Sequence, residues 1–262
     1  MKFLVVIASL AVVLTLQEVR GRTEVELLES ILSPDNLVKT KPPALALNGT
    51  TDVEFGIHPI WLELTPNGVI RGKSWYRYQW VDERLAWTLD ESNGMFQALR
   101  VNPINLWVPD VFPYSRFDSH KAMFAFHTDG AGSNALIYPS GRVLFVPEAG
   151  QEFICSDVDL DSIWGEHECL LKFGSWTYNG HLLNIIPYGG KTELELGDYE
   201  KSSPLLIKKS SVKREVKYYS CCGDEPYPAL VISLTVQRKF IIQDNGMIIH
   251  NPQLKSQGVQ CD

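Results

Sequence analysis

Short apolar runs interrupted by turn-forming residues dominate this chain, and they restrict it to an all-β fold. From Val53 onward, runs of Val, Ile, Trp, Tyr and Phe are separated by Gly, Pro, Asn and Asp. Ile232, Leu234 and Val236 alternate with polar neighbours, which is the two-residue period of a strand with one buried face. Many short strands with frequent turns predict a β-sandwich or a barrel.

Convincing helical periodicity is confined to residues 23–32 near the N-terminus. Leu27, Leu28 and Ile31 fall on one face there, and Pro34 ends the helix. No repeat or linker divides the remaining chain. We therefore expect residues 22–242 to form a single domain, followed by a polar tail at residues 243–262.

The N-terminus resembles a secretory signal peptide, predicted at residues 1–21. Phe3 to Leu16 carries no charge, which suits an h-region but falls short of the roughly 17–25 residues of a membrane-spanning helix. We expect a secreted, extracellular product that does not span a membrane. Asn48 begins an Asn-Gly-Thr sequon, and its predicted glycosylation fits that compartment.

Charge and motif content exclude several classes of function. The chain has 24 basic and 31 acidic residues without a Lys/Arg cluster, so nucleic acid and anionic membranes are poor partners. The six histidines show no metal-ligand spacing, and nucleophile-elbow and phosphate-loop motifs are missing. The acidic run 157–161 lacks EF-hand spacing. We expect no enzyme activity, no metal and no cofactor.

Five cysteines in an oxidising compartment predict two disulfides and one free thiol. Fifteen arrangements are possible. The economical one joins Cys155 to Cys169 and Cys221 to Cys222, and leaves Cys261 free. Adjacent Cα atoms lie about 3.8 Å apart, below the usual disulfide range. Cys221 and Cys222 therefore either form a strained, stiff loop tip or pair elsewhere.

Strand alternation separates the aromatic residues of 75–80 into two groups. Trp75 shares a face with Arg77 and Gln79, whereas Trp80 shares the opposite face with two tyrosines. A tryptophan on the polar face is an interface candidate rather than a core residue. By the same rule, Leu144 and Val146 share a face.

Two aromatic segments, 106–114 (LWVPDVFPY) and 171–178 (LKFGSWTY), begin a series of six motifs. The others are W-x4-W-x-D at Trp75, Trp80 and Asp82, G-x-V-x-F-x-P at 141–147, the cysteines at 155 and 169, and Y-x-C-C-x4-Y at 219–227. Together, over about residues 23–240, they resemble the extracellular ligand-binding domain of Cys-loop (nicotinic-type) receptors.

Two departures from the receptor pattern indicate a soluble branch of this family. Receptors continue into four membrane helices, but here a polar tail follows. Their Phe-Pro-Phe-Asp sequence is replaced by Ser-Ile-Trp-Gly at 162–165. The chain therefore resembles the secreted acetylcholine-binding members of the family.

The resemblance implies an immunoglobulin-like β-sandwich with a short N-terminal helix, assembled as a ring of five identical subunits. A small cationic ligand, acetylcholine or nicotine-like, would bind in an aromatic box at each interface, held by cation–π contacts. The implied principal face comprises Tyr114, Trp176, Tyr219 and Tyr227, with Cys221–Cys222 as a lid. The implied complementary face comprises Trp75, Leu136, Leu144 and Val146.

Two alternatives remain open at this point. The chain is also compatible with a truncated ligand-gated channel subunit that lacks its membrane domain and assembles with other subunits. The second alternative is a secreted hydrolase built on a β-sandwich.

Overall fold

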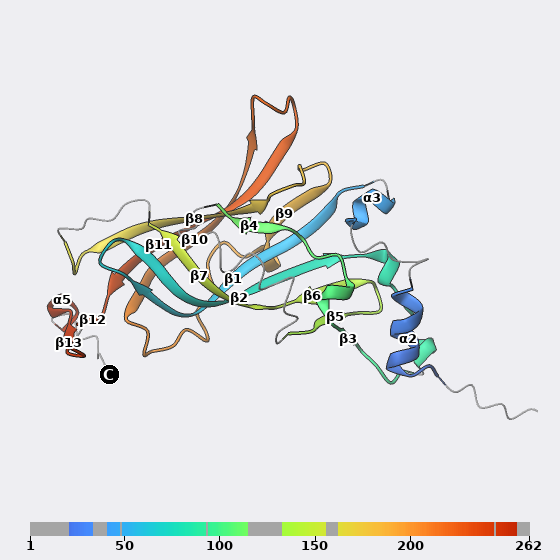
Figure 1. Cartoon of the computed structure of the whole chain (residues 1–262), viewed down its shortest axis with the longest axis horizontal. Helices are drawn as coiled ribbons and strands as arrows, with labels where there is room; N and C mark the ends of the chain where they lie inside the picture. The colour runs from blue at the N-terminus through green and yellow to red at the C-terminus, as the bar shows by residue number, and fades with distance from the viewer. Residues whose placement is uncertain are drawn as a thin grey trace, which may run out of the picture.

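The computed structural model describes residues 21–33, 41–47, 49–92, 94–114, 133–155, 162–243 and 245–255. They form a β-sandwich with a short N-terminal helix, which confirms the predicted fold class (Figure 1). Predictions for the signal segment up to residue 20, Asn48, the acidic run 157–161 and Cys261 lie outside the described residues.

The elements follow one another along the chain in this order: α2 (Glu24–Ile31), α3 (Pro43–Leu47), β1 (Thr51–Leu64), β2 (Val69–Val81), η1 (Glu83–Leu85), η2 (Leu89–Ser92), β3 (Leu99–Val101), η3 (Pro103–Asn105), β4 (Val111–Pro113), β5 (Ala135–Ile137), β6 (Arg142–Phe145), β7 (Glu148–Ile154), β8 (Glu166–Ser175), β9 (Leu183–Pro187), η4 (Tyr188–Gly190), β10 (Leu205–Tyr218), β11 (Pro226–Arg238), β12 (Phe240–Ile242), β13 (Ile248–His250) and α5 (Pro252–Lys255).

Local sequence explains the start of helix α2. Thr23 caps it by accepting a hydrogen bond from the Glu26 backbone N–H, and the Glu26 carboxylate accepts one from the Thr23 N–H. Leu27 and Ile31 are buried on the predicted apolar face. The predicted helix is thus confirmed, and helix α3, which begins at Pro43, was not predicted.

Two sheets pack face to face around the core. The larger has the order β3-β5-β6-β2-β1-β9, with β7 also paired to β2, and the smaller has the order β10-β11-β8-β4. Phe55 of β1 and Tyr76 of β2 contact Phe173 of β8, at centroid distances of 5.1 and 5.8 Å. The core therefore lies between the sheets, and the other face of the larger sheet is directed away from the smaller one.

Side-chain alternation along β2 follows the prediction from sequence. Tyr76, Tyr78 and Trp80 are buried in the core, whereas Trp75 is partly exposed on the opposite face. A cross-sheet disulfide adds to this packing, since Cys155, directly after β7, is bonded to Cys169 in β8 with an S–S distance of 2.05 Å. It joins the two sheets at one end of the sandwich.

Part of the polar tail predicted at residues 243–262 has regular structure, in strand β13 and helix α5. Strand β12 pairs with β13, and Gly246, with φ of 80°, makes the turn between them. The side chains of Asn251 and Leu254 are fully buried. This C-terminal hairpin lies at the opposite end of the molecule from α2 (Figure 1). Among the described residues, no helix is long and apolar enough to cross a membrane.

Candidate ligand-binding site

Four predicted aromatic residues lie at the strand ends of the smaller sheet. Tyr114 follows β4, Trp176 follows β8, Tyr219 follows β10, and Tyr227 is the second residue of β11. The rings of Tyr114 and Trp176 are edge-to-face with centroids 6.3 Å apart. Those of Tyr219 and Tyr227 are also edge-to-face, at 5.3 Å. The structure thus brings these residues together as two aromatic pairs.

The two pairs lie close enough for the Tyr219 side chain to influence the ionisation of Tyr114. Burial raises the pKa of the Tyr114 hydroxyl, and the nearby Tyr219 and Asp110 side chains raise it further. A hydrogen bond to Glu225, 3.0 Å from the Tyr227 hydroxyl, raises the pKa of Tyr227. Both phenols therefore stay neutral through the physiological range and present uncharged rings.

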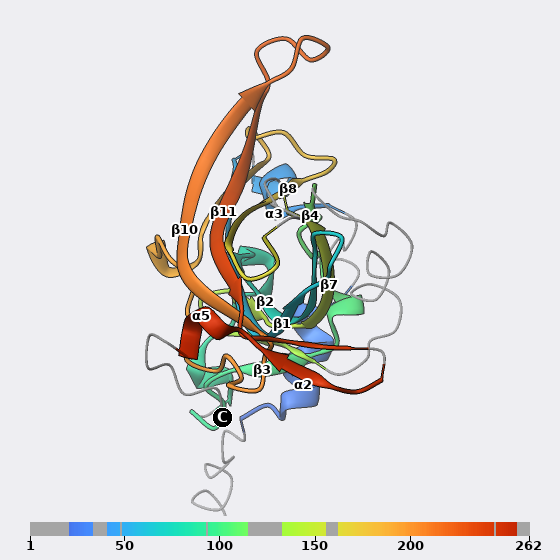
Figure 2. The ribbon, with the colours of Figure 1, turned by 90° about the vertical axis from the view of Figure 1, so that its left-hand side faces the viewer.

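The β10–β11 hairpin carries the tyrosine pair on a projecting arm. Its strands pair from Leu205–Arg238 to Tyr218–Pro226, and the hairpin rises well beyond the sandwich (Figures 1 and 2). At its tip Cys221 is bonded to Cys222, with Cα atoms 3.8 Å apart. The long ladder and the eight-membered ring together stiffen the segment between the two tyrosines.

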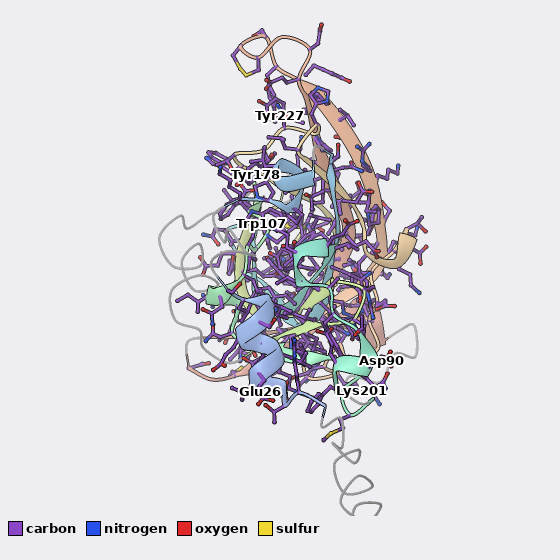
Figure 3. The ribbon with its side chains drawn as sticks, turned by 90° about the vertical axis from the view of Figure 1, so that its right-hand side faces the viewer. Glu26, Asp90, Trp107, Tyr178, Lys201 and Tyr227 are labelled. Atoms are coloured by element: carbon purple, nitrogen blue, oxygen red, sulfur yellow. A yellow bond between two sulfur atoms is a disulfide. The ribbon has the colours of Figure 1, made fainter. Side chains whose placement is uncertain are left out.

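A column of aromatic rings connects this end of the sheet to the core. Figure 3 shows Tyr227 at the base of the hairpin loop, with Tyr178 and Trp107 successively deeper in the molecule. Tyr178 contacts Trp107 at a centroid distance of 6.3 Å, and Trp107 contacts Trp80 at 6.0 Å. The Tyr178 ring is therefore packed onto the aromatic core of the sandwich through Trp107.

Asp110 holds the segment that carries Trp176. Its carboxylate accepts hydrogen bonds from the Ser175 hydroxyl at 2.5 Å and from the Thr177 backbone N–H and hydroxyl at 2.8 and 2.6 Å. Its carbonyl accepts the Trp176 backbone N–H at 3.2 Å. Asp110 is thus a positioning residue that the sequence analysis missed. Its partners lie 65 or more residues away, and no short spacing could reveal that contact.

A hydrogen bond and close packing against Gly174 fix the position of the Tyr114 ring. Its hydroxyl donates a hydrogen bond to the Ser175 carbonyl at 3.1 Å and lies 2.6 Å from where a Cβ on Gly174 would stand. A larger residue at 174 would displace the ring. The Lys172 ammonium lies 5.5 Å from the Tyr114 ring centroid. Burial is the main cause that lowers the pKa of Lys172, and repulsion from Lys217 lowers it further.

Trp176 is largely exposed to solvent in the single subunit. Its side chain is 71% exposed, although its neighbours Ser175 and Gly174 are buried. Aromatic side chains contribute mainly through the area they bury. The exposed indole is therefore available for a ligand or another subunit.

The four predicted residues of the complementary face lie on the outward side of the larger sheet. Trp75 is in β2, and across the sheet Gln79 of β2 pairs with Leu144 of β6, which pairs with Leu136 of β5. Leu136, Leu144 and Val146 are each half-buried between fully buried neighbours. These aliphatic residues lie on the same side of the larger sheet as Trp75, with Leu144 and Leu136 in register with Gln79, four residues further along β2.

The two sets of residues do not meet within one chain. The tyrosines and Trp176 end the strands of the smaller sheet, whereas Trp75 points away from that sheet. The predicted principal and complementary residues therefore lie on two separate surfaces of the subunit. In the part of the chain that the structure describes, no cluster of three or more His, Cys, Asp or Glu side chains could hold a metal.

Comparisons of the sequence with a family model and with individual proteins point to the same family. The sequence model of the neurotransmitter-gated ion-channel ligand binding domain matches residues 26–240. Acetylcholine receptor subunit beta-like 1 of Drosophila melanogaster is 35% identical over 188 residues, covering 70% of this chain and 34% of the relative. Acetylcholine receptor subunit alpha-type acr-16 of Caenorhabditis briggsae is 29% identical over 186 residues, covering 70% and 35%. The chain thus spans about a third of these relatives.

A solved structure shares the fold. Capitella teleta AChBP in complex with lobeline has a TM-score of 0.64 and 23% identity to this chain, covering 82% of this chain and 97% of that one. At this identity the likeness concerns the arrangement of the strands. It agrees with the two-sheet sandwich and the short N-terminal helix.

Proposed function

Since the chain belongs to the neurotransmitter-gated ion-channel ligand binding domain family, we propose that it is a secreted protein that binds acetylcholine and related cationic ligands between the subunits of a ring. The observation that supports this proposal is that the aromatic residues lie on two separate surfaces of one chain. Tyr114, Trp176, Tyr219 and Tyr227 form the first surface, and Trp75 belongs to the second.

The surfaces suit a ring better than a two-fold dimer. A two-fold interface brings identical patches together, whereas a head-to-tail interface joins two different patches and closes into a ring at the right rotation. Here one patch lies at the strand ends of the smaller sheet and the other on the outward face of the larger sheet. Five identical subunits are the assembly that we propose.

The chemistry suits a quaternary ammonium. Such a cation has no N–H to donate, so aromatic faces bind it, each contributing roughly 0.5–2 kcal/mol depending on desolvation. Several such faces with apolar burial can offset the entropy of binding and reach about micromolar affinity, near −8 kcal/mol. Closure of the Cys221–Cys222 tip would exclude water and strengthen each contact.

Acetylcholine is the first choice among amines because the relatives compared above are acetylcholine receptor subunits. An apolar N-terminal segment and a cross-sheet disulfide support export. The proposed role is to bind the ligand, not to transform it.

The test is a fluorescence titration of the secreted, purified protein with acetylcholine, nicotine, serotonin and glycine, combined with light scattering for the mass. We expect saturable quenching of tryptophan emission by acetylcholine and nicotine on a particle of five subunits. A monomer that binds neither would contradict the proposal and favour a subunit that needs other partners. Consumption of acetylcholine would instead establish a hydrolase.

A further inference from the structure

A buried histidine lies against the indole of Trp75. In the pairing of β1 with β2, His58 is directly opposite Trp75. Their rings are stacked, with centroids 5.6 Å apart and planes inclined by 22°. His58 is only 4% exposed, while Trp75 is 37% exposed. One face of the indole therefore rests on the imidazole, and the rest of the ring remains accessible.

Carboxylates of the segment between η4 and β10 face both imidazole nitrogens. Asp198 Oδ2 lies 2.9 Å from Nε2, and Glu195 Oε2 lies 3.9 Å from Nδ1. The 2.9 Å contact becomes an ion pair when the imidazole is protonated. Arg77, two residues from Trp75, also pairs with Glu195. His58 thus links the Trp75 indole to two acids and, through Glu195, to a guanidinium.

Residues 191–204, here called the strap, are fixed across the outward face of β1. The Ser203 hydroxyl donates to the Leu62 carbonyl at 2.6 Å and accepts from the Leu62 N–H at 3.1 Å. The Glu200 N–H donates to the Ile60 carbonyl at 2.8 Å. Before the acids, the Leu194 N–H donates to the Ser210 hydroxyl at 3.0 Å. Hydrogen bonds of the strap therefore flank the two acids that face His58.

We propose that His58 is a positioning residue of the ligand site, which holds the plane of the Trp75 indole and weakens cation binding when it becomes protonated. This inference rests on the proposed function. A neutral imidazole supports the ring without competing for its π electrons. An imidazolium stacked on the same ring is a second cation on one π system and repels a cationic ligand at the other face.

The charged surroundings set the pH range of this effect. Burial first, and then Arg77, lower the pKa of His58 below its ordinary value of 6.5, while Asp198 and Glu195 oppose the shift. Lys191 pairs with Glu195 at 3.4 Å, and beside Trp75 Lys73 pairs with Glu148 at 3.4 Å. His58 is thus neutral at pH 7.5, and its protonation follows acidification below 6.5.

The binding test compares wild type with His58→Phe, which keeps a stacked ring but cannot titrate. Calorimetric titration uses tetramethylammonium, whose charge does not depend on pH, in steps from pH 7.5 down to pH 5.0. We expect wild-type affinity to fall progressively as the pH drops below 6.5, by about fivefold once the imidazole is charged, and the His58→Phe affinity to stay constant. The matched control is His250→Gln, which alters a half-buried histidine of the C-terminal hairpin, away from the candidate site, and is expected to keep the wild-type profile.

A second readout needs no ligand, so it separates this inference from the proposed function. A protonated imidazole quenches an adjacent indole, and we expect an acid-induced loss of emission that both His58→Phe and Trp75→Phe abolish. If His58→Phe does not fold, His58→Gln takes its place.

Two results would overturn the inference: the same acid-induced loss of affinity in His58→Phe as in wild type, or a quench that does not depend on His58. If wild type binds no cation at any pH, the proposed function fails, and the quench alone then decides the role of His58.

Discussion

Replacement of Trp176 by alanine tests the principal face because the structure separates its effect on binding from its effect on folding. The side chain is 71% exposed in the subunit, so its removal opens no cavity in the core. The backbone contact of residue 176 with the Asp110 carbonyl, 3.2 Å long, does not depend on the side chain. We therefore expect the melting temperature and the oligomer mass to change little.

The expected loss of affinity follows from what the indole offers a ligand. A desolvated cation–π contact contributes about 2 kcal/mol. Covering about 40 Å² of the ring adds about 1 kcal/mol at 25 cal/mol per Å². Losing most of this sum, 2–3 kcal/mol, weakens binding by roughly 30- to 150-fold. A loss of at least about tenfold in acetylcholine affinity would support a place for Trp176 in the site.

Isothermal titration with acetylcholine measures this loss, beside light scattering of the same samples. Trp176→Phe retains a weaker π face and is expected to lose less than Trp176→Ala. The matched control is Tyr218→Ala, which removes a 64% exposed aromatic from the hairpin, outside the predicted site. Unchanged affinity in Trp176→Ala, with the control also unchanged, would refute the reasoning.

Three further changes have distinct expected outcomes. Asp110→Asn weakens the bonds that hold the Trp176 segment, so acetylcholine affinity should fall about tenfold; an unchanged titration would contradict this positioning role. Arg238→Met removes a buried guanidinium that donates to three carbonyls at 2.7–3.0 Å, so calorimetry should show a loss of about 3 kcal/mol of stability; an unaltered unfolding transition would count against it. Replacing both Cys221 and Cys222 by serine loosens an exposed tip, so affinity should fall about tenfold at constant melting temperature; equal affinities would remove the tip from the site.

Local periodicity in the sequence predicted the elements whose determinants are local. Helix α2 follows from a Thr23 cap and an apolar stripe, and the two faces of β2 follow from a two-residue period. The same period separated Trp75 from Trp80 and Leu144 from Phe145, and in the structure Trp80 and Phe145 are buried in the core whereas Trp75 is partly exposed. Only the resemblance of ordered motifs, however, could join residues on separate strands into one proposed site.

Contacts between distant segments could not be predicted. Asp110 accepts hydrogen bonds from Thr177, 67 positions further along the chain, and Asp198 contacts His58 from the strap. The predicted tail at residues 243–262 includes strand β13, which the sequence does not reveal because three residues are too few for a clear period. Asn251 is polar yet fully buried, since its side chain donates to the Arg238 carbonyl at 2.8 Å. Only the folded structure shows that partner.

The central claim is that one binding site is shared by two subunits, and mixed rings test it most directly. Trp176→Ala impairs only the principal face and Trp75→Ala only the complementary face, so rings of either variant alone should bind acetylcholine weakly. Co-expression of the two variants should restore wild-type affinity at about a quarter of the interfaces, where an intact principal face meets an intact complementary face. If calorimetry of the mixed rings finds no high-affinity sites although wild-type rings have them, the two residues do not act across a subunit interface and the account is wrong.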